Sequence, residues 1–556
     1  MSVQATFSAT LVDEWAELGV TDAVVCPGSR STPLALPLAQ RLRTHVRLDE
    51  RSAAFYALGL AQATRRPVVV CVTSGTAAAE LHPAVVEAHH ARVPLIVCTA
   101  DRPPELHHTG ASQTIEQDAL FAVETRWRAD PGVPAAGLEA TWRPLAARAV
   151  AESAHGPSGP GPVHLNLAFR EPLTGGPDAL PARHHSAHTA PGAAPRSAPP
   201  AANPPLVGRG IIVVGGPSYG AADPRRVLDL ATKLGWPVLA DPLSGCRLEG
   251  TIAAADAIVR TGPELPEVVV QLGAPWLSKA LGTYVAEAAA AGAKVVVVDP
   301  WRQRPDPLGV ATEFVHADVD AWLTAMTEAA GPAGPAWLSS WRTMEARAQE
   351  AIERVLAPDL SEPQVARTLY RYAAAAEAPV FVSASMPIRD LEWYAGALPT
   401  PPVVRANRGA NGIDGVVSTA LGVAASAAPH RTLALLGDLA FLHDVSGLVN
   451  LPEVPCTFVV VDNGGGGIFS FLAQATALRA EEFEHLFGTP PTSDVGAVAR
   501  GFGLPVVEVT KLSELEPALD SFPASPALVR VRVPSRAQNV AVHDAINQAV
   551  RRALRP

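Results

Sequence analysis

The chain has 556 residues and a formal net charge of -10, and 48% of its residues are hydrophobic while 18% are charged. Such a length exceeds what one hydrophobic core usually supports, so we expect three domains. The acidic balance argues against a nucleic-acid partner, because such proteins gather Lys and Arg on one face. The apolar runs are of strand length and fall far short of the roughly 20 residues of a membrane helix.

The first 18 residues have neither the basic start nor the apolar core of a secretory signal, so we expect a cytoplasmic protein with no membrane partner. The five cysteines are odd in number, widely spaced and mostly inside apolar runs. We expect reduced core residues, not disulfides or a zinc site. They are Cys26, Cys71, Cys98, Cys246 and Cys456.

Short apolar strands alternate with helical stretches in the first part of the chain. The predicted strands are residues 21–28, 66–75, 93–101 and 161–167, and the predicted helices include 49–64 and 76–91. Residues 174–208 are then rich in Pro, Ala, Gly and Ser without apolar periodicity. That composition is typical of a linker.

The same alternation returns twice after the linker. It predicts strands at 209–216, 236–241, 267–274 and 294–300, and, beyond a break at 329–337, at 378–385, 400–409, 431–438, 456–465, 504–510 and 526–533. Strands that alternate with helices indicate βαβ units and parallel sheets. We therefore predict an α/β protein with three doubly wound parallel-sheet domains. Their predicted bounds are 1–175, 208–345 and 355–556, with a linker at 176–207.

Two apolar strands of the third block end in groups that suit a metal ion. One leads into Gly437 and Asp438, and the other leads into Asp462, Asn463 and the glycines 464–467. In open parallel sheets, ligands bind at the carboxyl ends of strands. A carboxylate, an amide oxygen and a backbone carbonyl are ligands that Mg²⁺ accepts, and phosphate oxygens and water often complete its shell.

The glycine loop itself matches neither common phosphate-binding fingerprint. It lacks the last glycine of the dinucleotide motif and the Gly-Lys-Ser/Thr ending of a phosphate loop. We therefore predict that it approaches a phosphate through a metal. Each residue alone also fits a structural role, because Asp438 can cap the next helix and Asn463 can occupy a turn.

Taken together, the Gly437-Asp438 pair and Asn463 with its glycines resemble the diphosphate and metal motif of the thiamine-diphosphate enzymes. The usual first asparagine of that motif is here Asp462, a position that is not a metal ligand in the family. The resemblance implies that Mg²⁺ or Mn²⁺ is held by Asp438, Asn463 and the backbone oxygen of Gly465. It implies that thiamine diphosphate also contacts Gly437 and Ile468.

A thiamine enzyme also needs a carboxylate that hydrogen-bonds the aminopyrimidine ring. Glu50, in "HVRLDERSAAFYALGLA", stands where the family places it. An acidic residue in the first turn of a helix is also favoured by the helix dipole. The resemblance implies pyrimidine-binding, central and diphosphate-binding domains. It also implies a homodimer or homotetramer in which Glu50 of one subunit meets the diphosphate-binding domain of another.

Longer segments are similar to one branch, the 2-succinyl-5-enolpyruvyl-6-hydroxy-3-cyclohexene-1-carboxylate synthases. These segments are 26–34, 49–61, 73–88, 99–106, 407–422 and 466–472. The resemblance implies a transferase of menaquinone biosynthesis. It would decarboxylate 2-oxoglutarate on thiamine diphosphate and add the succinyl carbanion to isochorismate in a 1,4 fashion.

Both implied substrates are dicarboxylates, which arginine binds through two parallel hydrogen bonds. Four arginines fall in predicted strand-end loops, although any one of them also fits a surface salt bridge. By the resemblance, Ser29, Arg30, Arg102 and Gln113 hold isochorismate, and Ser385, Arg389 and Arg408 hold the succinyl carboxylate. Lys279 would touch isochorismate, although some members have Arg where this chain has Ala280. Ile413 would hold thiamine diphosphate in its bent shape.

Two other functions remain open on the sequence. One is another thiamine-diphosphate carboligase or 2-oxoacid decarboxylase, against which the four arginines argue. The other is a nucleotide-binding or regulatory protein that keeps the fold without the chemistry. Glu50 argues against this second alternative.

Overall fold

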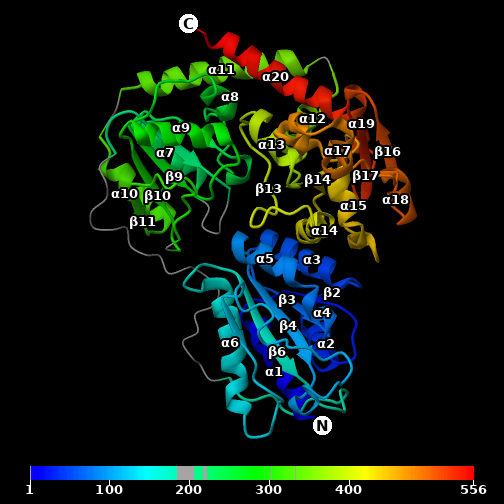
Figure 1. Cartoon of the computed structure of the whole chain (residues 1–556). Helices are drawn as coiled ribbons and strands as arrows, with labels where there is room; N and C mark the ends of the chain where they lie inside the picture. The colour runs from blue at the N-terminus through cyan, green and yellow to red at the C-terminus, as the bar shows by residue number, and fades with distance from the viewer. Residues whose placement is uncertain are drawn as a thin grey trace. The chain divides into compact units, whose positions relative to one another are not determined.

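The structure is a computed structural model that describes residues 2–183, 206–216, 222–301, 303–331, 334–357 and 359–555 (Figure 1). Most of the predicted linker lies outside the described residues. The chain forms two compact units. The N-terminal unit comprises residues 1–195, 407–428 and 443–454, and the C-terminal unit comprises 196–406, 429–442 and 455–556.

The N-terminal unit contains a six-stranded sheet in the order β2-β1-β3-β4-β6-β5. One face packs on α1, α2 and α6 through a cluster that includes Phe7, Trp15 and Trp142, and the other face packs on α3 and α5. The strands are β1 (Asp22–Val25), β2 (Arg43–Val46), β3 (Val68–Val72), β4 (Leu95–Asp101), β5 (Trp127–Ala129) and β6 (Pro162–Ala168). The helices are α1 (Val3–Glu17), α2 (Thr32–Arg41), α3 (Glu50–Thr64), α4 (Thr76–Ala79), α5 (His82–Ala91), η1 (Pro104–Leu106) and α6 (Glu139–His155).

The C-terminal unit contains two sheets, of which the first has the order β11-β10-β9-β7-β8. Helices α7 and α10 cover one face, and α8, α9, α11 and α20 contribute to the core on the other. The strands are β7 (Gly210–Val214), β8 (Val238–Ala240), β9 (Val268–Leu272), β10 (Lys294–Val298) and β11 (Glu313–Val315). The helices are α7 (Pro224–Leu234), η2 (Pro242–Ser244), α8 (Ala255–Val259), α9 (Lys279–Ala290), α10 (Val319–Ala329), α11 (Ala336–Leu356) and α20 (Arg536–Ala553).

The second sheet of the C-terminal unit has the order β13-β12-β14-β15-β17-β16. Helices α12, α13 and α19 cover one face, and α15 lies on the other, where Phe441 packs against Phe458 of β15. The strands are β12 (Val380–Val382), β13 (Val404–Arg405), β14 (Thr432–Gly437), β15 (Cys456–Asp462), β16 (Val506–Val509) and β17 (Ala527–Arg532). The other elements of this unit are α12 (Glu362–Ala375), α13 (Met386–Tyr394), α15 (Asp438–His443), η4 (Gly467–Phe471), α16 (Gln474–Ala477), α17 (Ala480–Phe483), η5 (Glu484–Gly488), α18 (Val495–Gly501), η6 (Leu512–Glu514) and α19 (Leu515–Asp520). The chain also forms α14 (Val416–Ala427) and η3 (Val445–Leu448), which belong to the N-terminal unit.

The described strand pairs of all three sheets are parallel, which confirms the predicted fold class. Three strands, β2, β5 and β11, were not predicted. All three lie at sheet edges and are short, and their residues are mostly polar or only partly buried. Such strands lack the continuous apolar run that marks a buried parallel strand.

Helix α11 runs through residues 346–354, the interval left between the predicted second and third domains, and α20 packs along it. Residues of both helices join the core of the β7–β11 sheet. Residues 407–428 and 443–454, although predicted in the third domain, belong to the N-terminal unit. The predicted domain bounds therefore stay predictions.

Within the N-terminal unit, α14 packs tightly against α3 (Figure 1). A Cβ at Gly59 would lie 2.1 Å from the Thr419 carbonyl oxygen, and a Cβ at Gly422 would lie 2.1 Å from the Tyr56 carbonyl oxygen. Each helix thus contributes a glycine where the two backbones meet. This close approach fixes α14 and the loop before it on α3, the helix that begins with Glu50.

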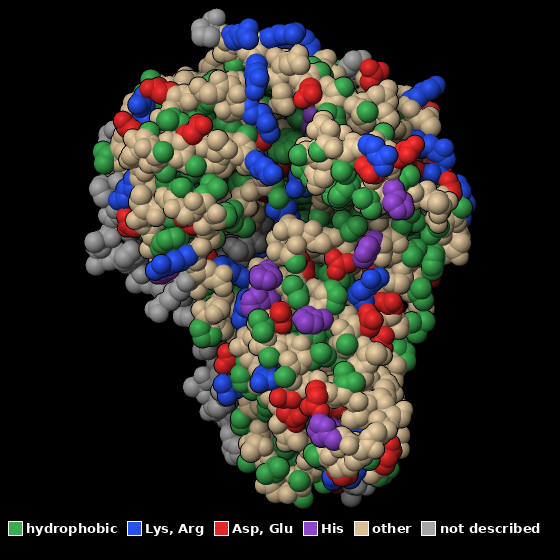
Figure 2. Space-filling view, viewed as in Figure 1, with side chains coloured by type: hydrophobic (Ala, Val, Ile, Leu, Met, Phe, Trp, Pro, Cys, Tyr) green, Lys and Arg blue, Asp and Glu red, His purple; other side chains and the backbone are tan. Residues whose placement is uncertain are grey.

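Acidic and basic side chains are interspersed on the face of the molecule shown in Figure 2.

Among the described residues, no helix has both the length and the apolar character to cross a bilayer. All five cysteines are buried and free, as predicted.

Candidate active site

Asp438 and the glycine loop meet at the carboxyl ends of β14 and β15, which are neighbours in the sheet. Asp438 begins α15, and its Oδ1 accepts a hydrogen bond from the Leu439 N–H at 2.7 Å. Its Oδ2 accepts one from the Gly465 N–H at 2.8 Å. Burial raises the pKa of the Asp438 carboxyl to about 6. Asp438 therefore starts a helix and also joins the two loops.

The Asn463 amide is held from one side only. Its Nδ2 donates a hydrogen bond of 2.9 Å to Oε1 of Glu362, the first residue of α12. Its Oδ1 is buried and has no hydrogen-bond partner in the described part of the chain. Buried polar atoms are nearly always paired, so this oxygen is suited to a ligand.

The glycines of the loop have two different roles. At Gly465, φ is +130° and a Cβ would lie 2.1 Å from the Gly488 carbonyl oxygen, so this glycine is needed for packing within the chain. At Gly437 and Gly464, a Cβ would meet nothing within 4 Å. Of these three glycines, only Gly437 and Gly464 border open space where a ligand could approach the backbone.

The donor atoms at the carboxyl ends of β14 and β15 fit a hard divalent cation with a diphosphate. They are the Asp438 carboxylate, the unpaired Asn463 oxygen and the Gly465 carbonyl, which also accepts a hydrogen bond of 2.8 Å from the Gly467 N–H. Among the described residues, no group of three or more His, Cys, Asp or Glu side chains is arranged to hold a metal. A cation here would therefore depend on amide, backbone and phosphate oxygens. Ile468, in η4, follows directly and is half-buried.

Asp462, the departure from the usual asparagine pair, is paired with an arginine. The Nε and one terminal nitrogen of Arg530, on β17, each lie 2.7 Å from its Oδ2. Arg530 also donates to Asp494 at 2.6 Å. The Asp462 charge is thus neutralised within the sheet.

Glu50 is the first residue of α3, in the N-terminal unit. The preceding Asp49 caps the helix by accepting a 2.7 Å hydrogen bond from the Ser52 N–H. Partial burial raises the pKa of the Glu50 carboxyl, and the negative charge of Asp49 adds to this effect. A carboxyl with a raised pKa is suited to share a proton with a ring nitrogen.

The loop that carries Arg408 and Ile413 is anchored by a carboxylate that we did not predict. Glu87, on α5, is 2% exposed and accepts hydrogen bonds from the backbone N–H groups of Gly409 at 2.7 Å and Ala410 at 2.6 Å. Arg408 and Ile413 are half-buried. In the sequence, Glu87 looks like any acidic residue of an amphipathic helix, so no local signal marks it.

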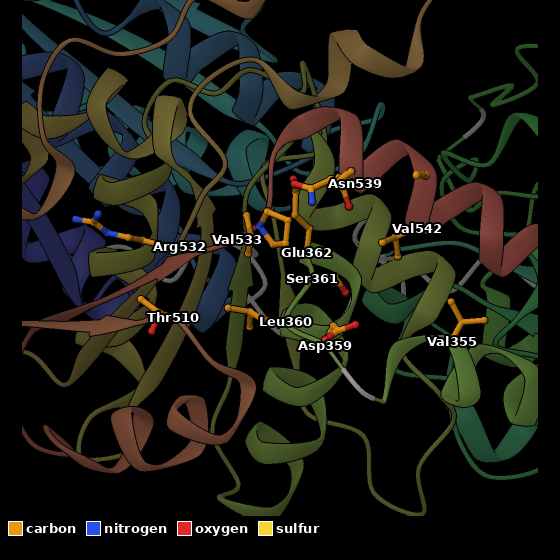
Figure 3. Close-up of a pocket in the computed structure, with 13 residues that line it drawn as sticks. Val355, Asp359, Leu360, Ser361, Glu362, Thr510, Arg532, Val533, Asn539 and Val542 are labelled. Atoms are coloured by element: carbon orange, nitrogen blue, oxygen red, sulfur yellow. The ribbon is translucent and has the colours of Figure 1, made fainter.

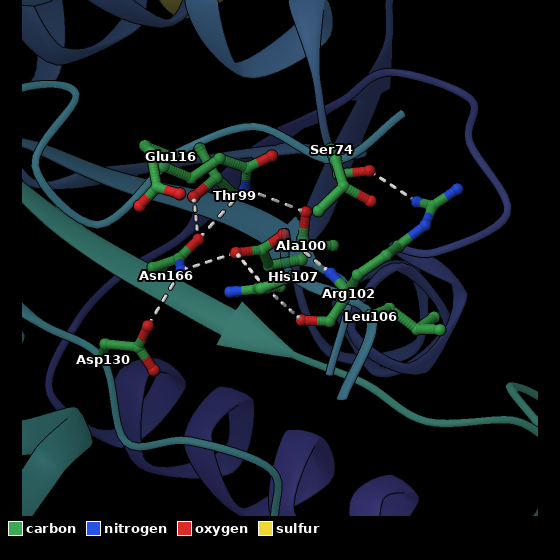
Figure 4. Close-up of polar contacts among 12 residues, drawn as sticks. Ser74, Thr99, Ala100, Arg102, Leu106, His107, Glu116, Asp130 and Asn166 are labelled. Atoms are coloured by element: carbon green, nitrogen blue, oxygen red, sulfur yellow. Dashed lines mark hydrogen bonds and ion pairs between the residues drawn. The ribbon is translucent and has the colours of Figure 1, made fainter. Parts of the chain in front are cut away.

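Arg102 and Gln113 both hydrogen-bond to Ser74, which follows β3, and Figure 4 shows the contact of Arg102 with Ser74. A terminal nitrogen of Arg102 donates to the Ser74 hydroxyl at 2.5 Å, and that hydroxyl donates to the Gln113 carbonyl at 2.8 Å. The Gln113 amide donates to the Ser74 carbonyl at 3.0 Å. His107, which also was not predicted, contacts the Arg102 carbonyl through Nε2 at 2.9 Å.

A polar network that includes Thr99, Asn166 and Asp130 lies beside Arg102 (Figure 4). Asn166, on β6, donates to Asp101 and to Asp130 at 2.9 Å each. Its amide oxygen accepts from Thr99 and from Gln117 at 3.0 Å each. Because Asp101 in turn accepts from the Arg102 N–H at 2.7 Å, the network fixes the backbone from which Arg102 extends.

Arg30 is 9% exposed and donates to the Phe169 carbonyl at 2.9 Å. Another terminal nitrogen lies 3.3 Å from the exposed Glu171 carboxylate. Burial and the charge of Arg30 both lower the pKa of Arg102. Ser29, next to Arg30, is exposed. The N-terminal unit thus holds a local positive site, although the chain is acidic.

The remaining predicted residues lie in the C-terminal unit. Ser385 precedes α13 with φ at +75°, and Arg389 donates to its carbonyl at 2.6 Å. Both are half-buried. Lys279 begins α9 and is exposed.

The structure therefore divides the predicted site residues between the two units. The N-terminal unit holds Ser29, Arg30, Glu50, Arg102, Gln113, Arg408 and Ile413, and the C-terminal unit holds Lys279, Ser385, Arg389, Gly437, Asp438, Asn463, Gly465 and Ile468. Within the units, Asp438 contacts Gly465, Ser385 contacts Arg389, and Ser74 joins Arg102 to Gln113. Their roles toward a cofactor and substrates stay predictions.

Three family models match consecutive parts of the chain. Residues 5–120 match the N-terminal TPP binding domain of thiamine pyrophosphate enzymes, and residues 205–382 match the middle domain. Residues 400–531 match the C-terminal TPP binding domain of the same enzymes.

Curated relatives match along nearly the whole chain, and each of the three described next is named 2-succinyl-5-enolpyruvyl-6-hydroxy-3-cyclohexene-1-carboxylate synthase. The protein from Thermobifida fusca is 43% identical, with 100% of both chains covered. The protein from Chloroflexus aurantiacus is 40% identical over 98% of this chain and 96% of its own. The protein from Lysinibacillus sphaericus is 37% identical over 96% of this chain and 95% of its own.

Proposed function

Because the chain belongs to the 2-succinyl-5-enolpyruvyl-6-hydroxy-3-cyclohexene-1-carboxylate synthase family of thiamine pyrophosphate enzymes, we propose that it makes this product in menaquinone biosynthesis. It is a thiamine-diphosphate-dependent transferase that forms a carbon–carbon bond. Its substrates are 2-oxoglutarate and isochorismate. The observation that carries the site assignment is the buried, unpaired Asn463 oxygen beside Asp438 at the ends of adjacent strands.

The cofactor supplies the carbanion chemistry, so the protein must bind, orient and neutralise charge. Asp438, Asn463 and the Gly465 carbonyl would hold Mg²⁺ or Mn²⁺ and, through it, the diphosphate. The open space at Gly437 and Gly464 supports this placement. Glu50 would hold a proton at the aminopyrimidine ring, and the raised pKa of its carboxyl supports that role. Ile413 and Ile468 would supply apolar contacts to the cofactor.

Two sets of cations would bind the substrate carboxylates. Arg30 and Arg102, with Ser29 and Gln113, would hold isochorismate, and the effect of the Arg30 charge on the pKa of Arg102 supports a site for a dianion. Arg389 and Arg408, with Ser385, would hold the succinyl carboxylate. Lys279 would contact isochorismate, and its exposed position at the start of α9 leaves it free to do so sterically.

The reaction is tested by incubating the protein with 2-oxoglutarate, isochorismate, thiamine diphosphate and Mg²⁺. We expect release of CO₂ and a product whose mass is the sum of the substrates less CO₂. Pyruvate should not replace 2-oxoglutarate. Turnover of pyruvate without use of isochorismate would instead identify another carboligase or a 2-oxoacid decarboxylase.

We further propose a cytoplasmic homo-oligomer, a dimer or tetramer, in which Glu50 of one subunit serves the metal site of another. Mixing two inactive variants tests this arrangement. If each site draws on two subunits, a mixed dimer of Glu50→Gln and Asp438→Ala contains one site with both native residues, so activity returns after subunit exchange. If both residues come from one chain, every site stays defective and no activity returns.

A further inference from the structure

We propose that Glu362 is a positioning residue for the metal site, because it fixes the amide of Asn463 so that the amide oxygen faces the cation. This inference rests on the proposed function, in which Asn463 is a metal ligand. No motif marked Glu362 in the sequence. Glu362 lies 101 positions before Asn463, the residue that it contacts, so only the folded structure reveals the contact.

The contact with Glu362 decides which end of the Asn463 amide faces the metal site. An asparagine amide has a donor end and an acceptor end that differ little in size, so its orientation depends on its neighbours. The carboxylate of Glu362 only accepts hydrogen bonds, and a protonated carboxyl group still accepts through its carbonyl oxygen. With Oε1 of Glu362 at 2.9 Å from Nδ2 of Asn463, rotation of the amide by half a turn would bring oxygen against oxygen. Glu362 therefore selects the orientation in which Oδ1 points away from it.

A second contact restricts the same amide. A Cβ at Gly467 would lie 2.5 Å from Nδ2 of Asn463, so the backbone of the glycine loop passes close to the nitrogen end. The oxygen end is buried and unpaired in the described part of the chain. The amide is thus held at its nitrogen and open at its oxygen, as expected for a metal ligand oriented by a neighbouring group.

Glu362 is itself well placed to hold this position. It is 4% exposed, and it begins α12, whose N-cap Ser361 accepts a hydrogen bond from the Gln364 N–H at 3.4 Å. Glu362 also lines a cavity of about 700 Å³ in the C-terminal unit, together with Asn539 and Val533 (Figure 3). Both polar atoms of the Asn539 amide are buried and lack a partner among the described residues.

The test measures binding of Mg²⁺ with thiamine diphosphate to the metal-free protein by calorimetry, so that catalysis is not needed for the readout. Loss of a group that orients a metal ligand typically costs about 10- to 100-fold in metal affinity. We expect Glu362→Ala to weaken binding within this range. Glu362→Gln should weaken it less, because its amide oxygen can still accept from Asn463. Glu392→Gln is the control, since Glu392 is 1% exposed and accepts instead from the Leu277 N–H.

A double-mutant cycle separates positioning from general loss of structure. If Glu362 acts through Asn463, Glu362→Ala should cost little further affinity in a chain that already carries Asn463→Ala. Additive losses in the double variant, or native affinity in Glu362→Ala, would overturn the inference. Native affinity in Asn463→Ala alone would instead overturn the metal assignment on which it rests.

Exchanging the carboxyl group and the amide between Glu362 and Asn463 provides a second test if Glu362→Ala does not fold. Asn463→Asp replaces the Nδ2 donor with an acceptor oxygen, so it should weaken metal binding by removing the hydrogen bond to Glu362. Adding Glu362→Gln to that variant should then improve binding, although the same change weakens it in the native chain. Weakening by Glu362→Gln in both backgrounds would contradict the direct contact.

Discussion

Removal of the Glu87 carboxylate tests whether the loop at residues 407–415 is held by one buried group. Glu87→Ala deletes both acceptors for the Gly409 and Ala410 N–H groups, which lie 2.7 and 2.6 Å away. A hydrogen bond to a charged group contributes about 1.5 to 3 kcal/mol. Two effects make the loss smaller than the sum of two such hydrogen bonds. Burial raises the pKa of Glu87, which reflects the cost of burying its charge. Ala410 is exposed, so water can replace one of the two bonds.

We therefore expect Glu87→Ala to lower the free energy of unfolding of the N-terminal unit by about 2 kcal/mol. In scanning calorimetry, this should lower the melting temperature of that unit by about 4 to 8 °C. Because the loop carries Arg408, kcat/KM for 2-oxoglutarate should also fall by about tenfold. Glu87→Gln keeps one acceptor oxygen, so its melting temperature and its kcat/KM should lie between those of the native protein and those of Glu87→Ala.

Glu17→Ala is the matched control for Glu87→Ala. Glu17 lies at the end of α1 with a side chain that is 50% exposed, so its loss should change neither quantity. A Glu87→Ala protein with the native melting temperature and native kinetics would show that the loop does not depend on this carboxylate. A lower melting temperature with native kcat/KM would show that the anchor stabilises the unit without placing Arg408.

Four further changes test other parts of the molecule. Asp438→Ala should abolish Mg²⁺-dependent binding of thiamine diphosphate, and undiminished calorimetric binding would remove it from the metal site. Glu50→Gln should retain cofactor binding but lose exchange of the thiazolium C2 proton, so exchange at the native rate would rule out its role. Arg102→Ala should raise KM for isochorismate by at least about tenfold, because it removes a charged hydrogen bond; an effect on 2-oxoglutarate alone would contradict the assignment. Burial lowers the pKa of His164 from 6.5 to about 4, so the unfolded chain binds its proton first and stability should fall as pH drops from about 6.5 to 4. His164→Gln should lose part of this dependence, on the order of 3 kcal/mol, and an unchanged pH profile of unfolding would disprove it.

The apolar strands were predictable because a strand buried on both faces needs a continuous apolar run, as in β3, β14 and β15. The edge strands β2, β5 and β11 carry no such run, so their pairing depends on neighbours that the local sequence does not show. The same limit applies to helix α11. Its buried residues and those of α20 belong to one core, and its other face is polar, so the local sequence does not show this packing.

The candidate ligands were predictable where a strand end and a motif coincide, as at Asp438 and Asn463. Their supporting residues were not. Glu87 and Glu362 each lie in a helix, and each meets its partner from a distant part of the chain. A single acidic residue in a helix has many roles, and only the fold brings these two to the backbone of a loop and the amide of a ligand.

The N-terminal unit is built from segments that lie far apart in the sequence, and this affects when it can fold during synthesis on the ribosome. Helix α3 packs its buried face on α14, which begins at residue 416, and the N-terminal unit also includes residues 443–454. Until those segments have been made, the residues of α3 that α14 covers lack their partner. The N-terminal unit therefore reaches its final packing late in translation, after most of the C-terminal unit's first sheet has emerged. A fragment that stops at residue 175 would expose this apolar helix face and should be prone to aggregate.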